Sequence, residues 1–366
     1  MRLRQLERPE LVAGIGSALT GGPAVAPVCA PRLAAALHLD APVEPGTALV
    51  VPTSGTTGAA KAVVLSAAAV TYAANAAHER LGGPGDWVCA LPVEHVAGLM
   101  TIARAVVAGT TVRFARGDLS DLPVAGARSY LSLVGAQLYR ALSEPDTVAT
   151  LSGYAAVLVG GGAIDPDLLS SARRAGIAVV TTYGASETCG GCVYDGEPLS
   201  GVRLELDAER ISLGGPMAFS GYRLRPDLTA AVLHGDLVRT RDRGRLVDGR
   251  LQVLGRLDDV VICGGEKVDL AAAQRLCEAE FGSPAQGGPV LLAVPDLRWG
   301  SRVVAVATGD WELAELRDRL QPVVGRAGVP KELRRLATMA YTSLGKIDRA
   351  ALQRAWGQKE EHGEAG

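Results

Sequence analysis

The residues best suited to chemistry stand close together between positions 53 and 61. Gly55 and Gly58 are interspersed there with hydroxyl side chains, and Lys61 ends the stretch. The hydroxyl residues are Thr53, Ser54, Thr56 and Thr57. Glycines let backbone N–H groups approach a ligand, hydroxyls add donors and a lysine adds charge, so this composition is typical of a loop that closes on phosphate. A hydroxyl-rich hairpin without a ligand is the alternative interpretation.

The spacing of these residues excludes one common phosphate loop, the Walker A motif. That motif has four residues between its glycines and places Ser or Thr directly after the lysine. Here two residues separate Gly55 from Gly58, and Ala62 follows Lys61. A different loop that binds phosphate is therefore expected.

The residues around the loop predict the elements that hold it. Residues 48–51 and 63–65 are apolar and indicate two buried strands, and Ser66 is expected to cap a helix over residues 67–80. Strands are then predicted at 87–91, 110–114, 130–133, 155–159 and 177–182, and helices at 96–108, 135–142 and 165–175, the last with Asp165 as its cap. This alternation predicts parallel sheets covered by helices. Residues 1–47 are rich in Ala, Pro and Gly and show no motif.

The pattern changes after residue 196. Short alternating segments at 203–206, 210–213, 245–247 and 250–254 predict antiparallel strands. We expect an α/β fold with a large N-terminal domain over residues 1–255, made of helix-covered sheets and a small β-rich part. A hinge at 256–258 would join it to a small mobile α+β domain over 259–358, with a helix at 269–281. The charged residues 359–366 are expected to be disordered.

Composition narrows the class of protein. The chain has 366 residues, and 48% of them are hydrophobic, which suits a large core. Its formal net charge of −2 gives no excess of positive charge that would attract nucleic acid or a membrane surface. The first residues lack the apolar region of a signal peptide, and the longest candidate membrane run, 96–108, is short and contains Arg104. The six cysteines are scattered along the sequence, a distribution typical of reduced thiols. A cytoplasmic protein is expected, and a homodimer is one option for its oligomeric state.

Several segments resemble, in order, the motifs of the adenylate-forming enzymes, which include acyl-CoA synthetases, peptide-synthetase adenylation domains and luciferases. The loop ending at Lys61 resembles their phosphate loop, although Ala60 and Ala62 replace the usual Pro and Gly. The other segments are Pro92–Leu99, Thr181–Thr188, Leu237–Gly244, Leu254–Val268 and Thr342–Arg349.

The resemblance implies a site for ATP and Mg²⁺. Tyr183 would stack on adenine beside Gly184, and Gly161 and Gly162 would approach the adenine edge. Glu187 would bind Mg²⁺, a hard cation that suits a carboxylate with phosphate oxygens.

Other nucleotide contacts are implied in the same way. Ser186 and Thr188 would contact the α-phosphate. Asp242, rather than the nearby Asp236, would accept hydrogen bonds from the ribose hydroxyls, although Arg241 replaces a glycine of the family pattern. Arg256 would contact ribose or phosphate.

The resemblance also implies sites for the acid and for CoA. His95 would lie at the acyl pocket, which the small residues Gly190, Gly191 and Cys192 would line. Because Cys189 and Cys192 form a Cys-x-x-Cys pair, a redox pair or half a zinc site is the alternative, but the sequence holds no second half to complete a zinc site.

The small domain would act in two poses. Lys346 would bridge the substrate carboxylate and the α-phosphate during adenylation, where its charge offsets the charge that builds up on phosphorus. After a turn about Asp258, Gly264 and Gly265 would lie beside the pantetheine arm of CoA.

The implied function is an ATP-dependent acid–CoA ligase that acts through an acyl-adenylate. The segment 183–196 resembles the actinobacterial o-succinylbenzoate–CoA ligases of menaquinone synthesis, whose second carboxylate would need an anchor such as Arg128 or Arg203. Another aryl- or fatty-acyl-CoA ligase, an amino-acid-activating enzyme and an inactive nucleotide-binding module remain open. The presence of Lys61, Glu187, Asp242 and Lys346 argues against the inactive module.

Overall fold

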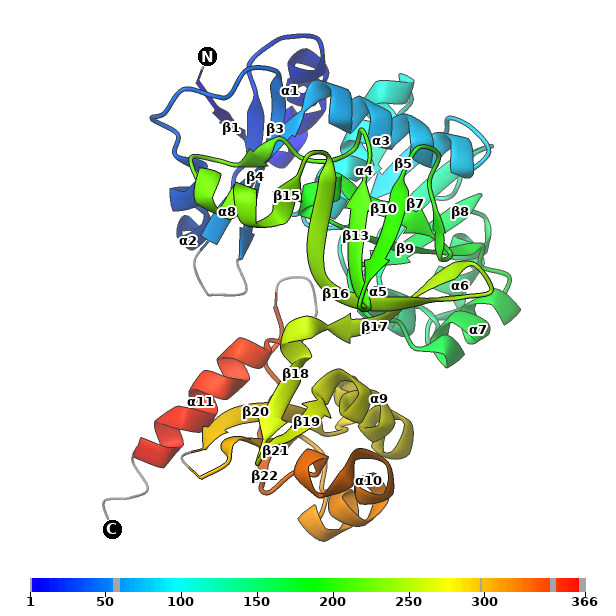
Figure 1. Ribbon diagram of the computed structural model, residues 1–366. Coiled ribbons are helices and arrows are strands. Elements are labelled where there is room, and N and C mark those ends of the chain that lie inside the picture. Colours follow the sequence, from blue (N-terminus) through cyan, green and yellow to red (C-terminus); the bar gives the residue numbers. More distant parts are fainter. Residues whose placement is uncertain (1, 55–59, 297, 343–346, 362–366) are drawn as a thin grey trace. The chain divides into compact units, whose positions relative to one another are not determined.

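The computed structural model describes residues 2–54, 60–296, 298–342 and 347–361 (Figure 1). The chain forms two compact units. The first comprises Met1–Thr240 with Arg245–Gln252, and the second comprises Arg241–Gly244 with Val253–Gly366.

The first unit is built on a sheet that runs β11-β10-β9-β8-β7-β5-β6 in the described residues. The strands are β5 (Asp86–Cys89), β6 (Val112–Phe114), β7 (Ser129–Val134), β8 (Ala156–Gly160), β9 (Val179–Ala185), β10 (Gly190–Tyr194) and β11 (Glu197–Pro198). Strands β5 to β9 run parallel, whereas β10 and β11 are antiparallel at one edge. The predicted alternation of strands and helices is thus confirmed.

Helices cover both faces of this sheet. On one face lie α5 (Gly135–Ala141), α6 (Pro145–Ser152) and α7 (Pro166–Arg174), which contribute Leu138, Leu151 and Ala172 to a shared core. The sequence analysis did not predict α6. On the other face lie α3 (Ala67–Arg80) and α4 (Val96–Ala108). The predicted caps are present, because Ser66 accepts a hydrogen bond from Ala69 N–H and Asp165 accepts one from Asp167 N–H.

Helix α4 lies between two sheets. Eight consecutive residues, from Gly98 to Ala105, are buried, as expected for a helix enclosed on all sides. Its second partner is the sheet β1-β2-β3-β4-β14, whose apolar residues share a core with Leu99 and Met100. The strands are β1 (Arg4–Leu6), β2 (Val25–Pro27), β3 (Thr47–Ser54), β4 (Ala60–Ser66) and β14 (Gly221–Tyr222).

Residues 1–47 thus contribute structure that the sequence analysis did not predict. Besides β1 and β2 they form α1 (Leu11–Leu19), α2 (Pro31–Ala34) and the 3-10 helices η1 (Arg8–Glu10) and η2 (Ala35–Leu37). Leu11 and Ile15 of α1 are fully buried in the same core as α4.

A smaller sheet confirms the predicted β-rich part. Its strands are β12 (Arg203–Asp207), β13 (Arg210–Gly214), β15 (Leu233–His234), β16 (Leu237–Val247) and β17 (Arg250–Arg256), with α8 (Pro226–Val232) before β15. Strands β12 and β13 are antiparallel, as are β15 and β16. The prediction for β16 was too short, because the strand starts at Leu237 rather than at residue 245.

The second unit has a hairpin and a three-stranded sheet in its described residues. The hairpin pairs β18 (Val260–Cys263) with β19 (Glu266–Asp269), and the sheet orders β20 (Val290–Asp296), β21 (Gly300–Ala307) and β22 (Leu333–Arg335). Side chains alternate along β20, so Leu291 faces α9 (Leu270–Phe281) and α10 (Leu313–Gly328), which is interrupted at Gly325. Val290 and Leu292 face α11 (Arg349–Glu361).

Helix α11 was not predicted, and it continues three residues into the charged segment expected to be disordered. The helix predicted at 269–281 is present as α9, and Asp269 caps it by accepting a hydrogen bond from Ala272 N–H. Every helix in the described ranges is too short or too polar to span a bilayer.

Candidate active site

The predicted phosphate loop joins two antiparallel strands. Thr53 at the end of β3 stands opposite Lys61 on β4, and Ser54 stands opposite Ala60. Gly55, Thr56, Thr57 and Gly58 lie outside the described residues. The flanking strands therefore bring the two ends of the loop together, as the apolar runs around it predicted.

The structure brings Lys61 next to Glu187, which is 126 residues away in the sequence. The Lys61 ammonium donates to Glu187 Oε1 at 3.2 Å, and both side chains are largely buried. Glu187 lies on the 3-10 helix η3 (Ser186–Thr188), directly after β9, so it stands at the carboxyl end of a parallel strand. Ligands bind at this edge of parallel sheets, which supports the role expected for Glu187.

A third residue, Tyr222, completes this arrangement. Its hydroxyl accepts a hydrogen bond from Lys61 Nζ at 2.5 Å and donates one to Glu187 Oε1 at 2.5 Å. The Lys61 ammonium also lies 3.8 Å from the centre of the Tyr222 ring. The sequence analysis missed Tyr222, because a single Gly-Tyr pair without periodicity carries no clear signal.

The turn after β9 is shaped by close backbone contacts. A Cβ on Gly184 would come within 2.0 Å of the Gly190 carbonyl oxygen, so only glycine fits this position. The Thr188 hydroxyl is fully buried, donates to Gly190 O and accepts from Ala185 N–H. In this structure Thr188 holds the turn, and the predicted phosphate contact of Thr188 remains a prediction.

Other predicted adenine-site residues also lie at strand ends. Tyr183 is a half-buried residue of β9, and Ser186 begins η3. Gly161 and Gly162 directly follow β8, and Gly161 has a left-handed backbone with φ of 84°. Because β8 and β9 are parallel neighbours, these residues share the same edge of the sheet.

The predicted acyl-pocket residues come from two neighbouring elements. His95 is the residue before the first turn of α4. A Cβ on Gly190 would meet Val96 and Met100 of this helix at 4.0 and 3.8 Å, so β10 and the start of α4 are in contact. Gly191 is partly exposed, whereas Cys192 is buried.

The two cysteines of the Cys-x-x-Cys segment are free thiols in the core. Burial raises the pKa of Cys189 strongly and raises the pKa of Cys192 to about 12. Reactive or metal-binding cysteines need an accessible thiolate, so these thiols are poorly suited to redox or zinc chemistry. No cluster of three metal-binding side chains occurs in the described ranges.

The second unit gathers a separate group of predicted residues. Arg256 Nη1 lies 3.3 Å from Asp242 Oδ1, and the same guanidinium binds both carboxylate oxygens of Asp258 at 3.0 and 3.1 Å. Burial raises the pKa of Asp258, but the hydrogen bonds and the charge of Arg256, a backbone hydrogen bond and the charge of Arg241 together outweigh it, and the pKa of Asp258 lies below its ordinary value.

The hairpin predicted to meet CoA turns at two glycines. Gly264 and Gly265 both have left-handed backbones, with φ of 60° and 86°. Gly264 packs against the Trp299 ring, where a Cβ would approach within 2.6 Å. Lys346 lies outside the described residues.

The two candidate anchors for a second carboxylate are engaged elsewhere. Arg203 forms a two-point ion pair with Asp236, at 3.0 and 2.5 Å. Arg128 Nη1 donates to the carbonyl oxygen of Gly82. Neither arginine contacts any of the predicted acyl-pocket residues in these hydrogen bonds.

The residues around Glu187 fit a magnesium ion that arrives with a nucleotide. Magnesium is bound in proteins by one or two carboxylates together with phosphate oxygens rather than by a complete protein cage. One carboxylate beside a lysine, without a cluster of further acidic groups among the described residues, matches that requirement. Glu187 would hold the ion, and Lys61 would neutralise phosphate charge.

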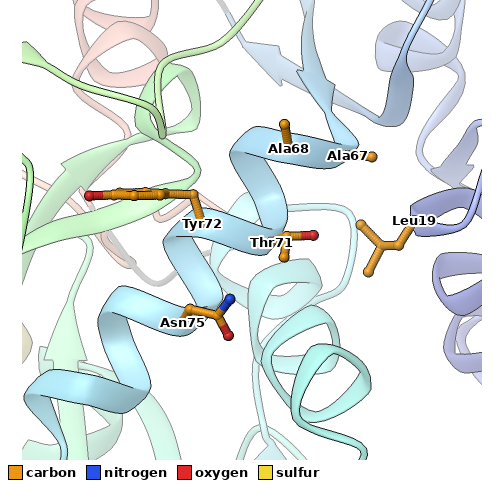
Figure 2. Close-up of a pocket in the computed structure, with 6 residues that line it drawn as sticks. All are labelled: Leu19, Ala67, Ala68, Thr71, Tyr72 and Asn75. Carbon is orange, nitrogen blue, oxygen red and sulfur yellow. The ribbon is translucent and has the colours of Figure 1, made fainter.

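An open pocket elsewhere in the first unit does not suit ATP. It has a volume of about 400 Å³ and lies where Leu19 of α1 meets the first turns of α3 (Figure 2). Its lining has no charged residue, and the Tyr72 ring points away from Leu19 toward the carbonyl of Ser200, to which its hydroxyl donates at 2.7 Å. A triphosphate would find no countercharge there.

Comparison with known proteins agrees with this geometry. The family model described as AMP-binding enzyme matches residues 23–247, which contain β3, β4, η3 and β14. The chain therefore belongs to the AMP-binding enzyme family. A probable 2-succinylbenzoate–CoA ligase of Mycobacterium tuberculosis (strain ATCC 25618 / H37Rv) is 42% identical over 343 residues, which are 88% of each chain. The 2-succinylbenzoate–CoA ligase of Escherichia coli (strain K12) is 30% identical, and the match covers 69% of that protein.

Solved structures confirm the fold of the chain. The o-succinylbenzoate–CoA synthetase MenE from Bacillus subtilis, in complex with the acyl-adenylate OSB-AMP, superimposes with a TM-score of 0.75 at 21% identity. The match covers 96% of this chain and 87% of that protein. A variant of E. coli MenE with bound OSB-AMS gives a TM-score of 0.76 at 24% identity, over 98% and 88% of the two chains. The chain thus has the adenylate-forming enzyme fold that the sequence predicted.

Proposed function

We propose that this protein joins 2-succinylbenzoate to CoA at the expense of ATP, in the biosynthesis of menaquinone. The observation that carries the proposal is the 42% identity, over 88% of both chains, to a probable 2-succinylbenzoate–CoA ligase. The meeting of Lys61 and Glu187 at a strand edge supplies the charges that such a reaction needs. The reaction uses ATP and CoA as substrates and Mg²⁺ as cofactor.

The charges of the reactants set the task of the site. A carboxylate oxygen attacks the α-phosphorus of ATP, although both groups are negative, and pyrophosphate leaves. Mg²⁺ supplies positive charge at the phosphates when it is bound. Lys61 and the donors of the loop would neutralise further charge, and Lys346 would act between the carboxylate and the α-phosphate. The sulfur of CoA then attacks the acyl carbon, and AMP leaves.

The remaining assignments belong to the same proposal. Tyr183, Gly161 and Gly162 would bind adenine, Asp242 would bind the ribose, and Arg256 would bind the ribose or a phosphate. His95, Gly190, Gly191 and Cys192 would line the pocket for the acid. Asp258 would be the hinge, and Gly264 and Gly265 would meet CoA. We also place the protein in the cytoplasm, where ATP and CoA are found, and propose a homodimer, which sedimentation would test.

A panel of acids tests the proposed substrate. The purified protein is incubated with Mg²⁺, ATP, CoA and 2-succinylbenzoate, benzoate or a fatty acid, and AMP, pyrophosphate and thioester are measured. We expect all three products with 2-succinylbenzoate. A thioester from benzoate or a fatty acid but none from 2-succinylbenzoate would refute the substrate and leave the family chemistry intact.

A further inference from the structure

We propose that Tyr222 is a positioning residue, which holds Lys61 and Glu187 in the arrangement that receives Mg²⁺ and ATP. The inference rests on the proposed function for the roles of Lys61 and Glu187. Its evidence is the bridging hydroxyl of Tyr222, which accepts from the ammonium and donates to the carboxylate, both at 2.5 Å.

Strand pairing explains how Tyr222 reaches Lys61. On the antiparallel pair of β14 and β4, Tyr222 stands opposite Val63 and Gly221 stands opposite Val64. Lys61 lies two residues from Val63 on the same strand, so its side chain projects from the same face as that of Val63. A tyrosine and a lysine in this diagonal relation are within reach of each other.

The backbone around Tyr222 is fixed on several sides. The Tyr222 N–H donates to the Thr229 hydroxyl at 2.8 Å, and the next residue, Arg223, donates its N–H to Ala62 O at 2.9 Å. The Phe219 N–H donates to the Glu187 carbonyl at 2.9 Å, which ties η3 to the segment that carries Tyr222. The Phe219 and Tyr222 rings also pack edge to face, with centres 5.0 Å apart.

The chemistry of the hydroxyl suits this task. Without it, a lysine and a carboxylate 3.2 Å apart are held together by one contact between two flexible side chains. The Tyr222 hydroxyl binds both groups, and its contact with the carboxylate falls on Oε1, the same oxygen that Lys61 contacts. The carboxylate is thereby oriented so that Oε2 takes part in neither contact and can serve a metal ion.

The test replaces the hydroxyl alone, in Tyr222→Phe, which keeps the ring and its packing. Tyr194→Phe is the matched control, because Tyr194 is a buried tyrosine of the same unit whose hydroxyl has no hydrogen-bond partner among the described residues. Binding of Mn²⁺ with a non-hydrolysable ATP analogue is followed by electron paramagnetic resonance. The rate of adenylate formation is measured in single turnovers.

We expect Tyr222→Phe to weaken Mn²⁺ binding and to slow adenylate formation by about 10- to 100-fold, the scale of a hydrogen bond to a charged group. The KM for the acid should change less than about twofold, and thermal melting should resemble that of Tyr194→Phe. In a Lys61→Met background, adding Tyr222→Phe should cost less than about threefold, because the two residues act as a unit.

The opposite results would overturn the inference. Mn²⁺ binding and adenylation like those of Tyr194→Phe would show that the hydroxyl is dispensable. If Tyr222→Phe slowed adenylate formation equally in the wild-type and Lys61→Met backgrounds, Tyr222 would not act through the lysine. Because Mn²⁺ and nucleotide binding needs no acid, this part of the test stands even if 2-succinylbenzoate is not the substrate.

Discussion

Asp236 and Asp242 are close in the sequence, but their side chains are placed very differently. Asp236 is about half exposed and is held by Arg203 in a two-point ion pair, which lowers the pKa of Asp236 below its ordinary value. Asp242 is 22% exposed and lies beside Arg256, which is expected to contact the ribose or a phosphate. These environments support Asp242 as the ribose ligand.

The two aspartates can be compared directly by mutation. Asp242→Ala should raise the KM for ATP about 10- to 100-fold, because the ribose loses a charged acceptor worth about 1.5–3 kcal/mol. Asp236→Ala should change it less than about threefold, since an exposed ion pair contributes little. Steady-state kinetics at varied ATP measures both values, and the reverse ranking would mean that the ribose site is misassigned.

A buried histidine makes the stability of the first unit depend on pH. His78 accepts a hydrogen bond at Nε2 from Trp87 Nε1–H, and Arg104 lies over the Trp87 ring. Burial, and to a lesser extent the charge of Arg104, lowers the pKa of His78 from 6.5 to about 4. Between these values the unfolded chain binds a proton that the folded chain does not.

We therefore expect His78 to reduce the free energy of unfolding as pH falls from about 6.5 to about 4, by up to about 1.4 kcal/mol per pH unit. Above pH 6.5 it contributes no pH dependence, because both states are neutral. His78→Gln keeps an acceptor for Trp87 and removes the titrating group. The free energy of unfolding of this variant should therefore fall less steeply between pH 6.5 and pH 4. Urea unfolding at a series of pH values measures the slope, and an unchanged slope would contradict the assignment.

At the scale of elements, Arg223, the residue after strand β14, binds the segment between η2 and β3. The buried guanidinium of Arg223 donates to the carbonyl oxygens of Leu37, His38, Ala41 and Pro42 and to the Glu44 carboxylate. A fully buried charge is tolerated only when such partners satisfy it. This contact holds the strand that carries Tyr222 against an N-terminal segment that the sequence analysis left without elements.

Arg223→Met should lower the free energy of unfolding by about 3–5 kcal/mol, because four carbonyl oxygens and the Glu44 carboxylate lose their buried donor. Arg225→Met is the control. Arg225 is an exposed arginine two residues away that pairs with Asp227, and its loss should cost less than about 1 kcal/mol. Chemical denaturation measures both variants, and similar values for the two would show that the buried contact does not stabilise β14.

At the scale of the whole molecule, the chain divides into two units, and the proposed hinge belongs to the second. Asp258 lies on the 3-10 helix η4 (Leu257–Asp259) and pairs with Arg256 and, at 3.6 Å, with Arg241. Arg241 stands where the family pattern has a glycine, and its exposed side chain lies beside the carboxylate of the proposed hinge residue. The proposed reaction has two halves, adenylate formation and thioester formation. Lys346 is proposed to act only in adenylate formation.

The two half-reactions separate these roles. Lys346→Ala should slow adenylate formation by about 10²–10³-fold, the usual scale for one preorganised charge, and should spare thioester formation from pre-made acyl-adenylate and CoA. Asp258→Pro should do the reverse, because proline fixes φ and hinders the turn, so adenylate should accumulate. Equal loss of both half-reactions in Lys346→Ala would show that the lysine is structural.

The sequence by itself determined the local features of this protein. The apolar runs beside the predicted phosphate loop form β3 and β4, and Ser66 and Asp165 cap helices as expected. These signals act over a few residues, through burial periodicity and side chain to backbone bonds, so they can be read without knowing the rest of the chain. The placement of Glu187 at a strand end followed from the same local pattern.

Only the tertiary structure decided which distant residues meet. Tyr222 reaches Lys61 because of the register between β14 and β4, and the two residues are 161 positions apart. Likewise, Arg223 is satisfied by carbonyls of residues 37–42, in a region where the sequence showed no motif. No local pattern encodes such contacts, because strand pairing and burial across the sheet depend on how the whole unit packs.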